Sequence, residues 1–147
     1  MNPPPDHLEA ALQALPHGRQ FRFVDQLRSL IPGKQGVGEY RVRGDETFLE
    51  GHFPGEPIFP GVLVLEACAQ VAGVVAQTAP QTAPLKRLKL TALHNLKILG
   101  AVRPGELMVL QASITGRMGQ LVQADVECRV GERLITKGAL TLSGDTL

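Results

Sequence analysis

Residues 62–78 constrain the fold of this chain more than any other segment, because apolar side chains occupy almost every position. Such a pattern is typical of a helix that is buried on most sides. Pro60 and Gly61 precede the segment and favour the start of a helix there. Many of the residues are small, so neighbouring backbone can approach closely. The sequence therefore predicts one central helix, about 25 Å long at 1.5 Å per residue.

The strands expected around this helix lie mainly after it. Their apolar patterning and turn residues predict four strands, over residues 88–98, 107–115, 121–130 and 133–142. One further strand is predicted over residues 36–43, an extended or looping segment over 21–34, and a short helix over 7–15. A long buried helix with antiparallel strands indicates an α+β fold whose sheet curls around the helix.

Length, charge and cysteine content exclude several classes of protein. A chain of 147 residues suits a single domain, residues 1–147, which can bury a core without disulfides. The net charge of +1 does not indicate a nucleic-acid-binding protein. The two cysteines, Cys68 and Cys128, lack the spacing of metal ligands, so we expect no metal site.

No segment is expected to enter a membrane. The most apolar stretch, residues 62–76, is 15 residues long and contains Glu66 and Gln70, whereas a spanning helix needs about 20 mostly apolar residues. The N-terminus has neither the basic nor the apolar region of a secretory signal. We therefore expect a cytoplasmic protein.

The loop over residues 44–60 is expected to carry function. Three prolines and three glycines exclude regular structure over most of it. It nevertheless contains Phe48, Phe53 and Phe59, which are half of the aromatic residues of the chain. A solvated linker would not concentrate apolar bulk in this way, so the sequence predicts an ordered loop packed against the rest of the protein.

Glu66 is the most costly residue of the predicted helix, because it lies about one turn inside an otherwise apolar segment. Burial disfavours a charged carboxylate and is expected to raise the pKa of Glu66. Gln70 lies one turn further on the same face, where its amide can orient the Glu66 carboxyl group. The residues alone leave alternatives open: Glu66 is functional or belongs to a buried polar network, and Gln70 orients it or is an ordinary core amide.

His52 lies in the loop that returns to the start of the helix carrying Glu66. The two side chains can therefore line one cavity, where an imidazole and a carboxylic acid form an acid–base pair. A single histidine is otherwise more often structural. Gly61 can offer a free backbone N–H, at the positive end of the helix dipole, to a carbonyl oxygen that gains negative charge. Pro60-Gly61 is equally consistent with a simple helix start.

One motif links these residues to a known family. Residues 51–63 read Gly-His-Phe-Pro-Gly-Glu-Pro-Ile-Phe-Pro-Gly-Val-Leu and are followed by Glu66-Ala67 and Ala69-Gln70. This motif closely resembles the signature of the β-hydroxyacyl-acyl carrier protein dehydratases of the FabZ type, and the spacing of 14 residues between His52 and Glu66 agrees with it. Leu15-Pro16-His17, residues 21–25 and Pro104-Gly105-Glu106 resemble further motifs of that family. The resemblance covers most of the chain.

The resemblance implies a hot-dog fold and the loss of water from a (3R)-3-hydroxyacyl thioester in fatty acid biosynthesis, which gives a trans-2-enoyl thioester. His52 would be the catalytic base and Glu66 the acid, each from a different subunit of a dimer. The Gly61 N–H would bind the thioester carbonyl. Further substrate contacts would come from Gln70, Phe53, Phe59 and Val62. The implied partners are an acyl carrier protein and further copies of the chain, as a dimer or a trimer of dimers, and the chemistry requires no metal or cofactor.

The sequence departs from the family pattern at four places, which leaves the acyl-chain length, the carrier and the pathway open. These places are Gly18, Gln20, Phe59 and Gly100-Ala101. The hot-dog fold also carries other chemistries, so an acyl thioesterase and a non-catalytic acyl-binding subunit are kept as alternatives.

The remaining histidines and cysteine are assigned structural roles. His7 and His17 are predicted to be surface or packing residues, His94 is read as structural, and Cys68 as a small buried thiol. No acidic residue lies between Glu66 and Glu106, although five basic residues do: Lys86, Arg87, Lys89, Lys97 and Arg103. This basic set either steers an acidic carrier protein toward the site or forms the solvated face of a strand.

Overall fold

The computed structural model of the chain describes residues 5–51 and 55–145. Within these residues lie the helices α1 (Pro5–Leu12) and α2 (Gly61–Gln77) and short 3-10 turns at Arg19–Phe21 and Thr47–Leu49. The strands are β1 (Gln26–Ile31), β2 (Gln35–Arg41), β3 (Lys86–Ile98), β4 (Leu107–Met118), β5 (Leu121–Val130) and β6 (Arg133–Asp145).

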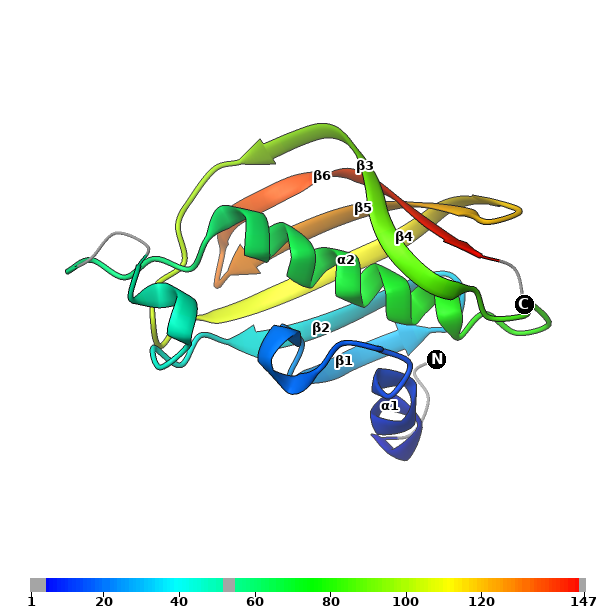
Figure 1. The fold of residues 1–147 in the computed structure, drawn as a ribbon, viewed down its shortest axis with the longest axis horizontal. Coiled ribbons are helices and arrows are strands. Elements are labelled where there is room, and N and C mark those ends of the chain that lie inside the picture. The colour runs from blue at the N-terminus through cyan, green and yellow to red at the C-terminus, as the bar shows by residue number, and fades with distance from the viewer. Residues whose placement is uncertain (1–4, 52–54, 146–147) are drawn as a thin grey trace.

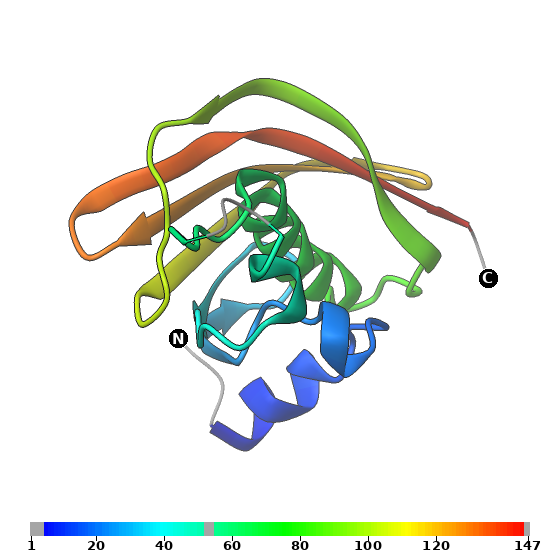
Figure 2. The ribbon, with the colours of Figure 1, turned by 60° about the vertical axis from the view of Figure 1, so that its left-hand side comes forward.

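The strands form one antiparallel sheet in the order β1-β2-β4-β5-β6-β3. The sheet curls around α2, which lies along its concave side (Figures 1 and 2). Strands β1 and β3 form the two edges, and α1 packs against β1. This arrangement is the hot-dog fold, and it confirms the α+β fold with a curled sheet that the sequence predicts.

Helix α2 is the centre of the core, as its apolar sequence predicts. Of its 17 residues, 11 are buried. Glycines of β2 allow the helix to lie close to the sheet: a Cβ atom at Gly36 would lie 2.8 Å from Cγ2 of Val75, and one at Gly38 would lie 3.0 Å from Cγ2 of Val71. Cys68 is fully buried, as predicted, and this burial raises the pKa of its thiol well above the usual value.

Several local predictions differ from the structure. Residues 26–31, expected within an extended or looping segment, form strand β1, so the sheet has six strands where the sequence predicts five. The first helix ends at Leu12 rather than residue 15, because Gln13 and Ala14 already form a turn. In the predicted strand 88–98, the alternation of apolar and polar residues places Ile98 on one apolar face with Leu88 and Leu90, yet Ile98 is 52% exposed. Strand β3 has irregular pairing with β6 and a positive φ of 50° at Asn95, which interrupts the alternation of its two faces.

Membrane insertion finds no support in the helices. Within residues 5–51 and 55–145, neither the length nor the apolar character of any helix is sufficient to cross a membrane.

Candidate active site

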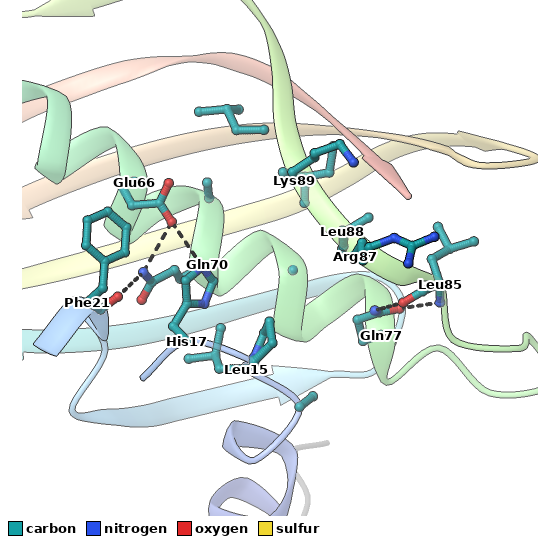
Figure 3. A pocket seen from close by; sticks show the side chains of 16 residues that line it. Leu15, His17, Phe21, Glu66, Gln70, Gln77, Leu85, Arg87, Leu88 and Lys89 are labelled. Carbon is teal, nitrogen blue, oxygen red and sulfur yellow. Dashed lines mark hydrogen bonds and ion pairs between the residues drawn. The ribbon is translucent and has the colours of Figure 1, made fainter. Parts of the chain in front are cut away.

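A pocket of about 300 Å³ lies beside α2 (Figure 3). One face of the helix lines it, with Glu66, Gln70, Gly73 and Gln77 following one another at helical spacing. The opposite walls come from the segment before β1 and from the first half of β3. They include Leu15, Pro16, His17, Phe21, Leu85, Leu88 and Leu90. The pocket is therefore a groove along α2 with mainly apolar walls and polar groups at both ends, Glu66 and Gln70 at one end and Gln77 and Arg87 at the other (Figure 3).

Glu66 places its carboxyl group in this groove. Its side chain is 22% exposed, so Glu66 is only partly buried, less than its place in an apolar helix predicts. Oε2 accepts a hydrogen bond from Nε2 of Gln70 at 3.2 Å and lies 3.5 Å from Nε2 of His17 (Figure 3). For Oε1, the described part of the chain provides no hydrogen-bond donor. One oxygen is thus held by the protein, and the other is left for a ligand.

Gln70 is fixed by the backbone on both sides of its amide. Its Oε1 accepts a hydrogen bond from the N–H of Phe23 at 2.8 Å, and its Nε2 donates to the carbonyl of Phe21 at 2.8 Å. Because one end must face a donor and the other an acceptor, only one orientation of the amide satisfies both contacts. Gln70 is therefore both a core amide with backbone partners and a donor to Glu66, so the two alternatives left open by the sequence hold together.

His17 is the site residue that sequence reasoning missed. Predicted to be a surface or packing residue, it instead lines the pocket, stacks on Phe21 with ring centroids 6.1 Å apart and reaches Glu66. Its Nδ1 atom is buried and has no hydrogen-bond partner among the described residues. The signal that was available is the Leu15-Pro16-His17 motif, in which the proline sets the backbone immediately before the histidine.

Gly61 is the first residue of α2, as predicted. Its N–H has no acceptor within the described residues, as expected for the first turn of a helix. A Cβ atom here would lie only 3.3 Å from Cδ1 of Ile98, so the end of β3 approaches this backbone closely. Val62 is exposed and does not line the groove that holds Glu66.

Phe59 lies in an aromatic cluster beneath the 44–60 loop. It is 1% exposed, outside the lining of the groove, and its ring contacts those of Phe23, Tyr40 and Phe48 at centroid distances of 5.5–5.8 Å. This packing explains why a loop without regular structure contains so many aromatic residues.

Among the residues whose burial is described, the most buried carboxylate is Glu46, in the same loop, rather than Glu66. Glu46 accepts hydrogen bonds from the Tyr40 hydroxyl at 2.8 Å and from the backbone N–H groups of Gly44 and Arg43 at 2.7 and 3.1 Å. Burial by itself raises the pKa of Glu46, but these hydrogen bonds outweigh it, and the pKa is lowered. Glu46 therefore fixes, as a carboxylate, the chain that leads to residue 52.

His52 and Phe53 lie outside the described residues, so their predicted roles as base and substrate contact stay predictions. Over residues 5–51 and 55–145, no three side chains of His, Cys, Asp or Glu are grouped as a metal site requires. The two remaining histidines, His7 and His94, are exposed and do not line the groove.

Comparisons with known proteins cover nearly the whole chain. Residues 15–139 match the FabA-like domain family. The 3-hydroxyacyl-[acyl-carrier-protein] dehydratase FabZ of Clostridioides difficile is 34% identical over 134 residues, which are 91% of this chain and 94% of that protein. The protein of the same name from Caldanaerobacter subterraneus subsp. tengcongensis is 39% identical over 127 residues, or 86% of this chain and 89% of that protein.

Solved structures with similar folds include proteins of two activities. The dehydratase heterocomplex ApeI:P from Xenorhabdus doucetiae superposes with a TM-score of 0.77 at 16% identity, covering 92% of this chain and 91% of that chain. Zebra fish thioesterase superfamily member 2 gives a TM-score of 0.62 at 18% identity, covering 80% of this chain and 79% of that chain. At such identities the likeness establishes the fold alone.

Proposed function

Because the chain belongs to the FabA-like family and, within it, to the 3-hydroxyacyl-[acyl-carrier-protein] dehydratases of the FabZ type, we propose that it removes water from a (3R)-3-hydroxyacyl thioester on acyl carrier protein. The product is the trans-2-enoyl thioester, formed by a cytoplasmic enzyme of fatty acid biosynthesis. The observation that carries the proposal is the Glu66 carboxyl group in the groove, with one oxygen held by Gln70 and the other without a donor among the described residues.

The elimination needs a base at C2 and an acid at the C3 hydroxyl group. His52 takes the proton from C2, the electron pair of that bond forms the double bond between C2 and C3, and the C3–O bond breaks. Glu66 gives its proton to the departing hydroxyl group, which leaves as water. The Gly61 N–H binds the thioester carbonyl and stabilises the negative charge that develops on its oxygen.

The groove beyond Glu66 suits an acyl chain. It follows α2 past Gly73 and ends at Gln77, whose amide is bound at both ends by Leu85: Nε2 donates to the Leu85 carbonyl at 2.6 Å, and Oε1 accepts from the Leu85 N–H at 2.9 Å. These two hydrogen bonds fix the orientation of the amide, so Gln77 closes the groove as a fixed wall. We propose that the acyl chain lies along this face of α2 and ends at Gln77.

A second copy of the chain is proposed to pair along β3. This strand is 13 residues long and forms an edge of the sheet, so one side of its backbone has no neighbouring strand in the described chain. Leu93, Ile98 and Leu99 expose large apolar side chains at or just after it. An edge with exposed apolar residues favours pairing with another chain. We propose that in such a dimer His52 of the partner subunit meets Glu66. Three such dimers would form the trimer of dimers that the family resemblance implies.

Two basic residues at the groove support an acyl carrier protein as the partner. Arg87 and Lys89 line it from β3, and Arg87 is bound by Asp145. Carrier proteins are acidic, so exposed positive charge on the surface around the groove accelerates their approach, and raised salt concentration weakens this effect. Lys89 and Arg87 are therefore the proposed steering residues.

The test is a dehydration assay with 3-hydroxyacyl-acyl carrier protein substrates on the wild type and on Glu66→Gln. We expect enoyl product from the wild type and a turnover lower by about 10²–10⁴-fold in Glu66→Gln, the usual contribution of a positioned acid. Release of free thiol without enoyl product would identify a thioesterase instead. Binding of acyl carrier protein without any turnover would identify a non-catalytic acyl-binding subunit.

A further inference from the structure

Two donors converge on one oxygen of Glu66. The Nε2 atoms of Gln70 and His17 lie 3.2 and 3.5 Å from Oε2, whereas the described residues offer Oε1 no donor (Figure 3). In a neutral carboxyl group, the hydroxyl hydrogen cannot point at an N–H donor, because two hydrogens would then face each other. The acidic proton of Glu66 therefore belongs on Oε1, the oxygen to which the described residues offer no donor.

Gln70 alone does not secure this arrangement. One of its two N–H groups is used by the carbonyl of Phe21, so a single N–H remains for Glu66. The carboxylate that forms when Glu66 loses its proton has two lone pairs on Oε2, and a second donor is needed to satisfy both. His17 is the side chain placed to supply that donor.

The surroundings of His17 favour the hydrogen on Nε2. With the hydrogen on Nδ1, that N–H would be buried without an acceptor, and Nε2 would face the Glu66 oxygen with a lone pair. With the hydrogen on Nε2, the ring gains one contact, and only Nδ1 lacks a partner. The separation of 3.5 Å is long for a hydrogen bond, as is common in active sites without substrate, where such contacts shorten when substrate binds.

We infer that His17 is a positioning residue for the dehydration. Its Nε2–H holds Oε2 of Glu66, keeps the acidic proton on Oε1, and stabilises the carboxylate that remains after that proton has left with the hydroxyl group as water. The inference rests on the proposed function, because it assigns a role relative to the acid Glu66. His17 itself neither gains nor loses a proton in this step.

Three substitutions at His17 distinguish a role as hydrogen-bond donor to Glu66 from a role in packing alone. In His17→Gln the amide nitrogen lies near the former Nε2 position and can donate a hydrogen bond to Glu66. In His17→Asn the amide nitrogen lies near the former Nδ1 position and does not reach Glu66. His17→Ala removes the hydrogen-bonding group altogether. The matched control is His7→Ala, which removes an exposed histidine of α1 outside the groove. Circular dichroism and thermal unfolding establish that each variant is folded before kcat and KM are measured on one 3-hydroxyacyl-acyl carrier protein substrate.

We expect His17→Ala and His17→Asn to lower kcat by about 10- to 100-fold, the effect of losing a hydrogen bond to a charged group. KM should change less than about threefold, because the lost contact acts on Glu66 rather than on substrate binding. His17→Gln should recover most of kcat. Wild-type kcat in His17→Ala, or equal loss in His17→Gln and His17→Asn, would overturn the inference. Absence of dehydration in both the wild type and His7→Ala would instead refute the proposed function, and with it this role.

A second measurement does not depend on turnover. The ¹⁵N NMR shifts of the His17 ring in the full chain at neutral pH report which nitrogen carries the hydrogen. We expect Nε2–H with an unprotonated Nδ1, and a change in the Nε2 shift in Glu66→Gln. The opposite tautomer, or shifts that are unaffected by Glu66→Gln, would overturn the inference even if the enzyme is an active dehydratase.

Discussion

Replacing Gly73 by leucine tests whether the groove beside α2 holds the acyl chain. Gly73 lies on the lining face of the helix, between Gln70 and Gln77. A Cβ atom at this position would meet Cδ2 of Leu88 at 3.8 Å, an ordinary van der Waals contact. Alanine therefore fits without displacing any neighbour, whereas the longer leucine side chain must occupy the groove itself.

The size of the effect follows from the length of groove that leucine blocks. The four helical steps from Gly73 to Gln77 rise by about 6 Å, which is room for about five methylene groups at about 1.2 Å per bond. Each buried methylene contributes about 0.8 kcal/mol, so a chain that reaches past Gly73 loses up to about 4 kcal/mol. This loss lowers kcat/KM by up to about a thousandfold. A chain that ends before Gly73 loses almost nothing.

The assay compares kcat/KM for 3-hydroxyacyl-acyl carrier protein substrates of increasing chain length. Gly73→Leu should lose activity only on the long chains. Gly73→Ala is the matched control: it should keep the wild-type length profile and raise the free energy of unfolding by up to about 1 kcal/mol, because alanine is the better helix former. An equal loss on short and long substrates by a folded Gly73→Leu protein would refute the placement of the acyl chain.

Three further substitutions test the loop, the helix start and the sheet edge. Glu46→Gln should lower the free energy of unfolding by about 1–3 kcal/mol at neutral pH. The pKa of Glu46 is lowered in the folded protein, so its contribution to stability is complete above the ordinary pKa of 4.5 and is lost as the pH falls below 4.5. If urea unfolding gives the same difference between wild type and Glu46→Gln above and below pH 4.5, this prediction is contradicted. Gly61→Ala should lower kcat about tenfold or more, because its Cβ atom displaces the Ile98 side chain 3.3 Å away, beside the N–H that we propose binds the thioester. Unchanged kcat in a folded variant would argue against that role. If the chain pairs along β3 as proposed, Leu93→Lys should shift the proposed dimer toward monomer in analytical ultracentrifugation, whereas Met118→Lys, at the exposed β4–β5 turn, should not.

The fold was predictable because its strongest signals are local. An apolar helix with one glutamate, followed by strands separated by glycine turns, already requires a sheet that covers the helix, and the observed α2 begins and ends within one residue of the predicted bounds. The exposure of residues on the edge strand β3 was not predictable in this way. The alternation that assigns Ile98 to a buried face is correct for a regular strand, but β3 is irregular near Asn95 and has a neighbouring strand on one side only within the described chain.

The sequence by itself determined the candidate acid, because a carboxyl group one turn inside an apolar helix must be paired or functional, and it determined Gln70 as its neighbour through helical spacing. Only the tertiary structure decided that His17 joins them. That contact links a residue after α1 to the middle of α2, 49 positions away in the chain, and no local periodicity encodes such a distance. The same holds for the burial of the two glutamates. Glu46 is enclosed by loop backbone that folds back on it, whereas Glu66 opens onto a groove that exists only when β3 and the segment before β1 lie on either side of the helix.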